Sequence, residues 1–154
     1  SCDWLIWADA DSEATRDMSG QLLDLLARDE YLSVHFGVKH TRDDTTYFSC
    51  ETGFFMLNCH HPLYKDFCDT YKSIYVNDDI SNLRRYYDGE VYGETVLRLK
   101  QKGAKMLDLN AGHTHKTPIP RSVIGPYISH YKAGLKDSID FDEKTKAVIS
   151  ADKE

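Results

Sequence analysis

Two short apolar runs stand out from an otherwise mixed pattern of hydrophobic and polar residues. The first, at residues 4–8, contains two tryptophans and no charged side chain, and the second, at residues 54–57, directly follows Gly53. Uninterrupted apolar runs of this length are typical of strands that are buried on both faces of a parallel sheet. We therefore expect both segments to lie in the interior of a sheet.

Apolar residues at helical spacing, with polar segments between them, predict the remaining elements. An apolar stripe of Met18, Leu22, Leu23 and Leu26 predicts a helix that ends near residue 28, with Ser12 or Thr15 as its cap. The other predicted elements are a strand over residues 31–38, an exposed loop over 39–46, helices over 62–75 and 88–102, and a strand over 105–109. Strands that alternate with helices in this way indicate an α/β fold with a mixed, mostly parallel sheet flanked by helices.

The length of the chain indicates one domain, and its two ends differ in character. Residues 1–136 carry the predicted elements, whereas residues 137–154 form a mostly charged tail for which we expect a solvated helix or disorder. A parallel neighbour of the first strand needs a crossover of about a dozen residues. Because three residues precede that strand, we expect the chain to be the carboxyl-terminal portion of a longer protein.

Charge and hydropathy exclude several classes of function. The net charge of −6 argues against a general nucleic-acid or anionic-membrane binder, because such binding depends mainly on Lys and Arg. No apolar run approaches the length of a membrane span, and no basic-then-apolar signal segment opens the chain. We expect a cytoplasmic protein without a membrane span and without a nucleic-acid partner.

Asp9 and Asp11 directly follow the first apolar run. In open α/β sheets, ligands bind just outside the carboxyl ends of the strands, which is where both carboxylates are expected. Two carboxylates held close together repel each other unless a cation neutralises them. Oxygen ligands suit Mg²⁺ or Mn²⁺, which commonly also bind substrate phosphates. The alternative is a strand followed by an Asp-rich turn and a helix cap.

The order of these segments resembles the glycosyltransferases of the GT-A fold, and more narrowly the glycogenin-like and bacterial galactosyltransferase-like enzymes. The Asp9-x-Asp11 pair is similar to the motif that binds Mn²⁺ in that family, where the ion holds the diphosphate of a nucleotide sugar. Gly53, the apolar run after it and Asn58 resemble the strand that lines the sugar site, with Glu51 where the family has asparagine. The resemblance implies a partial GT-A-like fold that lacks the amino-terminal, nucleoside-binding half.

Two later segments extend the resemblance. Asp88, which is followed here by glycine, resembles the aspartate that contacts the donor sugar or the acceptor. The segment from His130 through Gly134 to Lys136 is similar to the closing motif that supplies a metal-binding histidine and a phosphate-binding lysine, with one residue more between His130 and Gly134. Each residue also has a structural alternative, since an aspartate at a helix start is often a cap and a lone histidine is often structural.

The resemblance implies a metal-dependent glycosyltransferase with Asp9, Asp11 and His130 as ligands of Mn²⁺ or Mg²⁺. Its partners are a nucleotide-sugar donor and a carbohydrate or other hydroxyl acceptor, which Glu51 or Asp88 would bind or activate. The alternatives are a non-catalytic sugar-binding or assembly module and a nucleotidyltransferase. An edge left by missing strands would favour self-association, so a homo-oligomer is also expected. A haloacid dehalogenase-type phosphatase fits less well, because Glu13 stands where that family has Thr or Val.

Overall fold

The computed structural model describes residues 3–42, 45–111 and 118–130. In these ranges the chain forms three α-helices, two short 3₁₀-helices and six strands. In chain order they are β1 (Trp4–Ala8), β2 (Ser12–Ala14), α1 (Ser19–Leu26), β3 (Ser33–Arg42), β4 (Thr45–Asn58), α2 (Tyr64–Val76), η1 (Asp79–Asn82), α3 (Asp88–Gln101), β5 (Met106–Asp108), η2 (Ile119–Arg121) and β6 (Ile128–His130). The predicted tail at residues 137–154 lies outside the described residues.

Four strands form the central sheet in the order β1-β4-β3-β5, and β2 pairs with β6 in a separate ribbon. The β1–β4 and β3–β4 pairs are antiparallel, and the β3–β5 pair is parallel. Strands β1, β3 and β5 therefore run in one direction and β4 runs in the other. The predicted α/β class and the mixed sheet are confirmed, but the sheet is not mostly parallel in its pairing, since parallel pairing joins only β3 and β5 among the described strands.

The expectation that the first apolar run is buried on both faces is wrong. β1 lies at the edge of the sheet and has one neighbour, β4, among the described strands. Leu5, Ile6 and Trp7 keep 37%, 44% and 49% of their surface exposed. An apolar run shows only that a strand lacks charges. It does not predict whether a second strand or a further layer covers that strand.

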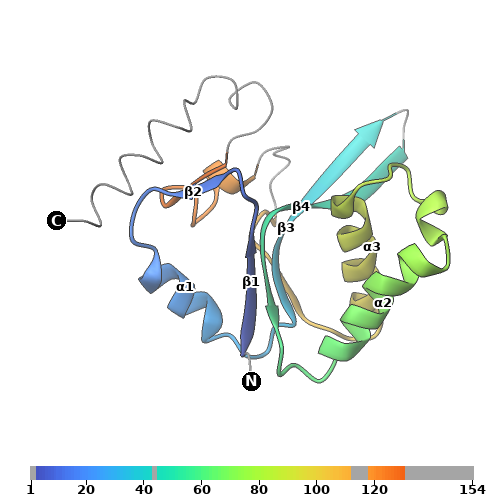
Figure 1. Ribbon diagram of the computed structural model, residues 1–154, viewed down its shortest axis with the longest axis horizontal. Coiled ribbons are helices and arrows are strands. Elements are labelled where there is room, and N and C mark those ends of the chain that lie inside the picture. Colours follow the sequence, from blue (N-terminus) through green and yellow to red (C-terminus); the bar gives the residue numbers. More distant parts are fainter. Residues whose placement is uncertain (1–2, 43–44, 112–117, 131–154) are drawn as a thin grey trace.

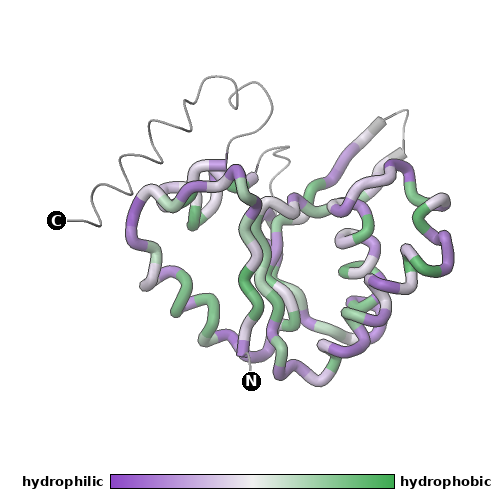
Figure 2. Tube along the Cα trace, viewed as in Figure 1, coloured by the Kyte–Doolittle hydropathy of each residue, from purple (hydrophilic) through white to green (hydrophobic). Residues whose placement is uncertain are grey.

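The loop predicted at residues 39–46 is also corrected, because residues 39–42 of β3 and residues 45–46 of β4 pair as an antiparallel ribbon. Its register pairs Val38 with Ser49 and Thr41 with Thr46. Polar side chains are compatible with this structure because the backbone ladder satisfies the peptide groups while the side chains face water. The projecting ribbon at the upper right of Figure 2 is accordingly drawn mostly in purple and white.

The central sheet separates two hydrophobic layers (Figure 1). On one side, α1 and η2 cover a core that contains Val34, Phe54 and Met56. On the other side, α2 and α3 cover a core that contains Leu57, Phe67 and Tyr92. Consecutive β4 residues thus contribute to opposite cores, which follows from the alternation of side chains along a strand.

The two longer helices confirm the sequence predictions to within two residues, whereas α1 is shorter than predicted. Ser12 does not cap α1 but begins β2, and the helix begins only at Ser19. Leu23 is 64% exposed, and Leu25 takes the buried position instead. Met18, Leu22 and Leu26 pack against the core as predicted, so the predicted stripe fails at Leu23 alone.

Helix α3 packs with its backbone close to β4. A Cβ atom at Gly93 would lie 2.7 Å from the Cα atom of Ser49, a distance that real side chains do not reach. Glycine at this position therefore allows an approach that any other residue would prevent. The close packing sets the amino-terminal turn of α3, which begins at Asp88, against the middle of β4.

Candidate metal centre

Asp9 and Asp11 lie on a tight turn at the carboxyl end of β1. The Asp9 amide donates to the Gly53 carbonyl at 3.0 Å, which extends the β1–β4 ladder by one residue. The Ser12 amide then donates to the Asp9 carbonyl at 2.9 Å, and this bond closes the turn that leads into β2. Both carboxylates are therefore fixed to backbone that is hydrogen-bonded on each side of the turn.

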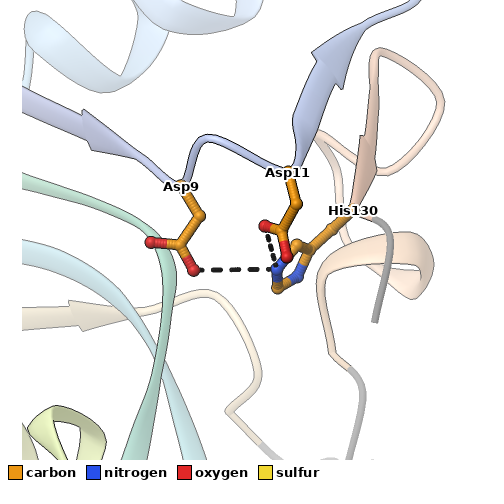
Figure 3. A group of neighbouring side chains, drawn as sticks. All are labelled: Asp9, Asp11 and His130. Atoms are coloured by element: carbon orange, nitrogen blue, oxygen red, sulfur yellow. Dashed lines mark ion pairs between the residues drawn. The ribbon is translucent and has the colours of Figure 1, made fainter. Parts of the chain in front are cut away.

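His130 reaches the two carboxylates because β6 pairs with β2. The register places His130 opposite Ser12, the residue after Asp11. The His130 Nε2 atom lies 3.2 Å from Asp11 Oδ1 and 3.7 Å from Asp9 Oδ2. Figure 3 shows the three side chains converging from the turn and from β6. Residues from the two ends of the described chain thus form one cluster.

The floor of the cluster is Gly53, against which the His130 ring packs. A Cβ atom at Gly53 would lie 2.5 Å from His130 Cε1, so a larger residue would displace the imidazole. The His130 side chain is 6% exposed, the Asp11 side chain 20% and the Asp9 side chain 37%. Exposure increases from His130 to Asp9, and the cluster is open to a ligand on the Asp9 side.

The donor atoms of the cluster fit a divalent cation. One ligand atom from each of Asp9, Asp11 and His130 can be chosen so that all lie within 4.8 Å of one another. Carboxylates favour Mg²⁺ and Mn²⁺, whereas imidazole favours the later transition metals. Mn²⁺ accepts both kinds of ligand, so this set suits Mn²⁺ better than Mg²⁺. The contacts of His130 Nε2 with the two carboxylates are also those of a structural Asp–His–Asp network.

Trp7 is a part of this site that the sequence prediction missed. Its indole Nε1 donates to Asp9 Oδ1 at 3.0 Å and so orients the more exposed carboxylate. The spacing could have indicated the contact, because residues two apart on a strand lie on the same face. Support of this kind by a group that does not touch the ion is typical of metal sites.

Asp88 is joined to β4 through Thr52, the residue before Gly53. The Thr52 hydroxyl donates to Asp88 Oδ2 at 2.8 Å, and the Gly89 amide donates to Asp88 Oδ1 at 2.9 Å. Glu51 lies on the same segment of β4, and its Oε1 accepts a bond from the Gly53 amide at 3.4 Å. The residues predicted as catalytic are thus brought to the end of the sheet that carries the metal ligands.

Asn58, predicted to line the same sugar site, lies at the opposite end of β4. It pairs with Trp4, whereas the Gly53 carbonyl bonds to the Asp9 amide. Five residues of strand separate Asn58 from Gly53, a distance of roughly 16 Å. The Asn58 side chain is buried and bonds to the Asp29 carbonyl at 3.1 Å and to the His60 amide at 3.0 Å. These bonds hold the loops at that end of the sheet in place. The structure does not bring Asn58 to the metal cluster.

Gly134 and Lys136, the other predicted substrate-binding residues, lie outside the described residues.

The comparisons with known proteins identify neither a family nor a function for this chain. No protein-family model, no curated protein and no solved structure matches this chain. In the described ranges, none of the helices has the length and apolar character that crossing a bilayer requires.

Proposed function

We propose that this chain carries the metal site of a glycosyltransferase of the GT-A type, which transfers a sugar from a nucleotide-diphosphate donor. The observation that carries the proposal is the convergence of Asp9, Asp11 and His130 at the carboxyl end of β1. The ligands come from segments that are distant in sequence and are joined by the β2–β6 ribbon. The same end of the sheet carries Glu51 and Asp88, acidic groups of the kind that bind or activate hydroxyls.

The residues of the chain have separate tasks in this proposal. Asp9, Asp11 and His130 hold Mn²⁺ or Mg²⁺, and Trp7 and Gly53 keep Asp9 and His130 in place. The bound ion supplies positive charge that stabilises the departing nucleoside diphosphate. The Asp88 carboxylate accepts a hydrogen bond from a sugar hydroxyl or takes the proton of the acceptor hydroxyl, and Glu51 is the second candidate for this task.

Isothermal titration calorimetry with Mn²⁺ and a nucleoside diphosphate tests the proposal. The double variant Asp9→Ala, Asp11→Ala should lose affinity for Mn²⁺ by more than about 100-fold. Direct ligands contribute more to metal affinity than the groups that hydrogen-bond to the ligands, whose loss costs about 10–100-fold. The control is Asp66→Ala, Asp69→Ala, which removes two exposed carboxylates three residues apart on α2. Equal Mn²⁺ binding by the wild type and the first variant would contradict the metal site.

A non-catalytic assembly module is the second candidate, and the exposed edge of β1 favours it. Leu5, Ile6 and Trp7 lie on a strand with a free edge among the described residues, and free edges pair readily with other chains. An assay for hydrolysis of a panel of nucleotide sugars in the presence of Mn²⁺ separates the two candidates. The transferase releases a nucleoside diphosphate, and the assembly module releases none. A nucleotidyltransferase would instead release pyrophosphate from a nucleoside triphosphate.

A further inference from the structure

A groove of about 350 Å³ lies beside the metal cluster, between the β1–β4 edge and helices α2 and α3. Its volume is within the range of about 300–1,000 Å³ that is common for small-molecule sites. The walls are mostly aromatic, and one end is polar. The residues used below are Trp7, Thr52, Phe55, Tyr71, Asp88 and Tyr92.

Trp7 presents a flat apolar surface in this groove. One face of its indole is stacked on Phe55, with ring centroids 6.0 Å apart and planes 11° from parallel. The bond from its Nε1 to Asp9 fixes the orientation of the ring. Trp7 lies on β1, the edge strand among the described residues, and 49% of its surface is exposed. The result is a rigid platform of the size of one pyranose ring.

The polar end of the groove is suited to hydroxyl groups. Asp88 is exposed, and its bonds from Thr52 and Gly89 use two of the roughly four lone-pair positions of a carboxylate. Asp88 is also the one charged residue among the described residues that line the groove. A negative charge without a cation nearby in the lining disfavours phosphate and favours a neutral ligand with hydroxyl donors.

The tyrosines in the walls carry no charge at ordinary pH. Burial raises the pKa of Tyr71 and of Tyr92, so both phenols stay protonated. The groove therefore combines neutral aromatic walls, a stacking platform and one carboxylate. These are the features that recognise a carbohydrate, whose ring has an apolar face and a periphery of hydroxyls.

We propose that this groove binds a neutral carbohydrate acceptor, with one pyranose ring stacked on Trp7 and a hydroxyl donated to Asp88. The inference rests on the proposed glycosyltransferase function and deepens it by naming the class of acceptor. The indole platform and the metal cluster are linked directly, since the Trp7 that contacts the sugar also bonds to Asp9.

Tryptophan fluorescence provides a direct test, because the chain has two tryptophans. Trp4→Phe leaves Trp7 as the one remaining indole. Cellobiose, maltose and lactose serve as probes, and sorbitol serves as a polyol without a ring. At least one disaccharide should change the Trp7 emission in a saturable manner, and sorbitol should not. If the variant does not fold, the indole N–H resonances of the wild-type protein give the same readout.

Variants at the two ends of the groove sharpen the test. Asp88→Asn should weaken disaccharide binding about tenfold, because a charged hydrogen-bond acceptor becomes a neutral one. Trp7→Ala, measured by calorimetry, should reduce binding at least as much. Tyr86→Ala removes an aromatic side chain that is 73% exposed and does not line the groove, and it should leave binding unchanged.

The outcomes separate this inference from the proposed function. Mn²⁺ binding without a response of Trp7 to any disaccharide at up to about 50 mM, well above a millimolar Kd, would overturn the carbohydrate groove and leave the metal site intact. Saturable disaccharide binding that depends on Trp7 and Asp88 would support the groove even in a protein that fails to bind Mn²⁺. A response to sorbitol equal to that for disaccharides would overturn the inference, since ring stacking would then contribute nothing.

Discussion

The His130 imidazole lies against the Cα atom of Gly53, with 2.5 Å between His130 Cε1 and the position that a Gly53 Cβ would take. The contact joins the middle of β4 to the last described strand, and it holds the ring toward Asp9 and Asp11. The absence of a side chain at Gly53 is thus a geometric requirement of the cluster.

The first prediction follows from this contact. Gly53→Ala should lower Mn²⁺ affinity by about tenfold or more, because His130 must rotate away from the two carboxylates. Calorimetry measures the change. Gly20→Ala is the matched control, since a Cβ atom there meets nothing within 4 Å and the metal site is untouched. Unchanged Mn²⁺ affinity in Gly53→Ala would show that His130 is not a ligand.

The second prediction concerns the packing of α3 on β4. Gly93→Ala should lower the free energy of unfolding by up to about 2 kcal/mol, since overpacking costs about 1–3 kcal/mol and the gain in helix propensity is about 1 kcal/mol. Backbone atoms of Ser49 block the new methyl group and cannot move aside as a side chain can. Urea denaturation measures the effect. Gly20→Ala, which adds the same methyl group in open space, should instead stabilise the protein, and equal stabilities of the two variants would contradict the close packing.

The third prediction is a loss of stability in acid that arises from His35. This side chain is fully buried, and burial lowers its pKa from 6.5 to about 4, with Asp108 acting to raise it and Lys100 to lower it. Its Nδ1 atom lies 3.3 Å from Ser33 Oγ, while Nε2 has no hydrogen-bond partner among the described residues. The folded state therefore binds the proton more weakly than the unfolded state does.

The sign of the effect follows from linkage. Above pH 6.5, His35 is neutral in both states and the folded protein has its full stability. As the pH falls from 6.5 to about 4, the unfolded state gains a proton first, and stability decreases by up to about 3 kcal/mol. Denaturation between pH 4 and 7 measures how steeply the free energy of unfolding depends on pH. In His35→Gln this slope should be smaller, by the equivalent of up to about one bound proton. Identical slopes would show that other groups cause the acid sensitivity.

The fourth prediction tests the role of Asp88. Asp88→Asn keeps one oxygen to accept the bond from the Gly89 amide, and its NH2 group can donate to the Thr52 hydroxyl, so the fold should be little affected. Sugar transfer should fall by about 100-fold or more if the carboxylate activates the acceptor. Asp24→Asn, an exposed position on α1, is the charge-matched control. A variant that transfers sugar at the wild-type rate would reassign Asp88 to capping α3.

Much of the architecture could be predicted from the sequence, because helices and short strands leave local periodic signals. The helix over residues 88–102 is confirmed, and its close packing on β4 explains Gly93. The exposure of β1 could not be predicted, since a neighbour for Trp7 and Ile6 depends on tertiary pairing. The ribbon over residues 39–42 and 45–46 was missed because water-facing strands need no apolar alternation.

Part of the candidate site could be predicted, because two aspartates directly after an apolar run are an uncommon combination. Asp9-x-Asp11 after an apolar run predicted two candidate metal ligands, and the structure brings His130 to them. The stacking position of Trp7 required the pairing of β1 with β4. The sequence pattern placed Asn58 and Gly53 in the same strand of the predicted sugar site. The length of strand between them puts Asn58 away from the metal cluster.

A cation bound at this centre would have a second role, because its ligands lie beside the β2–β6 ribbon. It would stabilise the contact between the two ends of the described chain. An ion that binds only the folded protein stabilises it by an amount that grows with the logarithm of its concentration. Melting temperature should then climb with added Mn²⁺, and chelation should first loosen β6 from Ser12 and His130 from its carboxylates. Substrate binding and protection from proteolysis would thus be governed by the same ion.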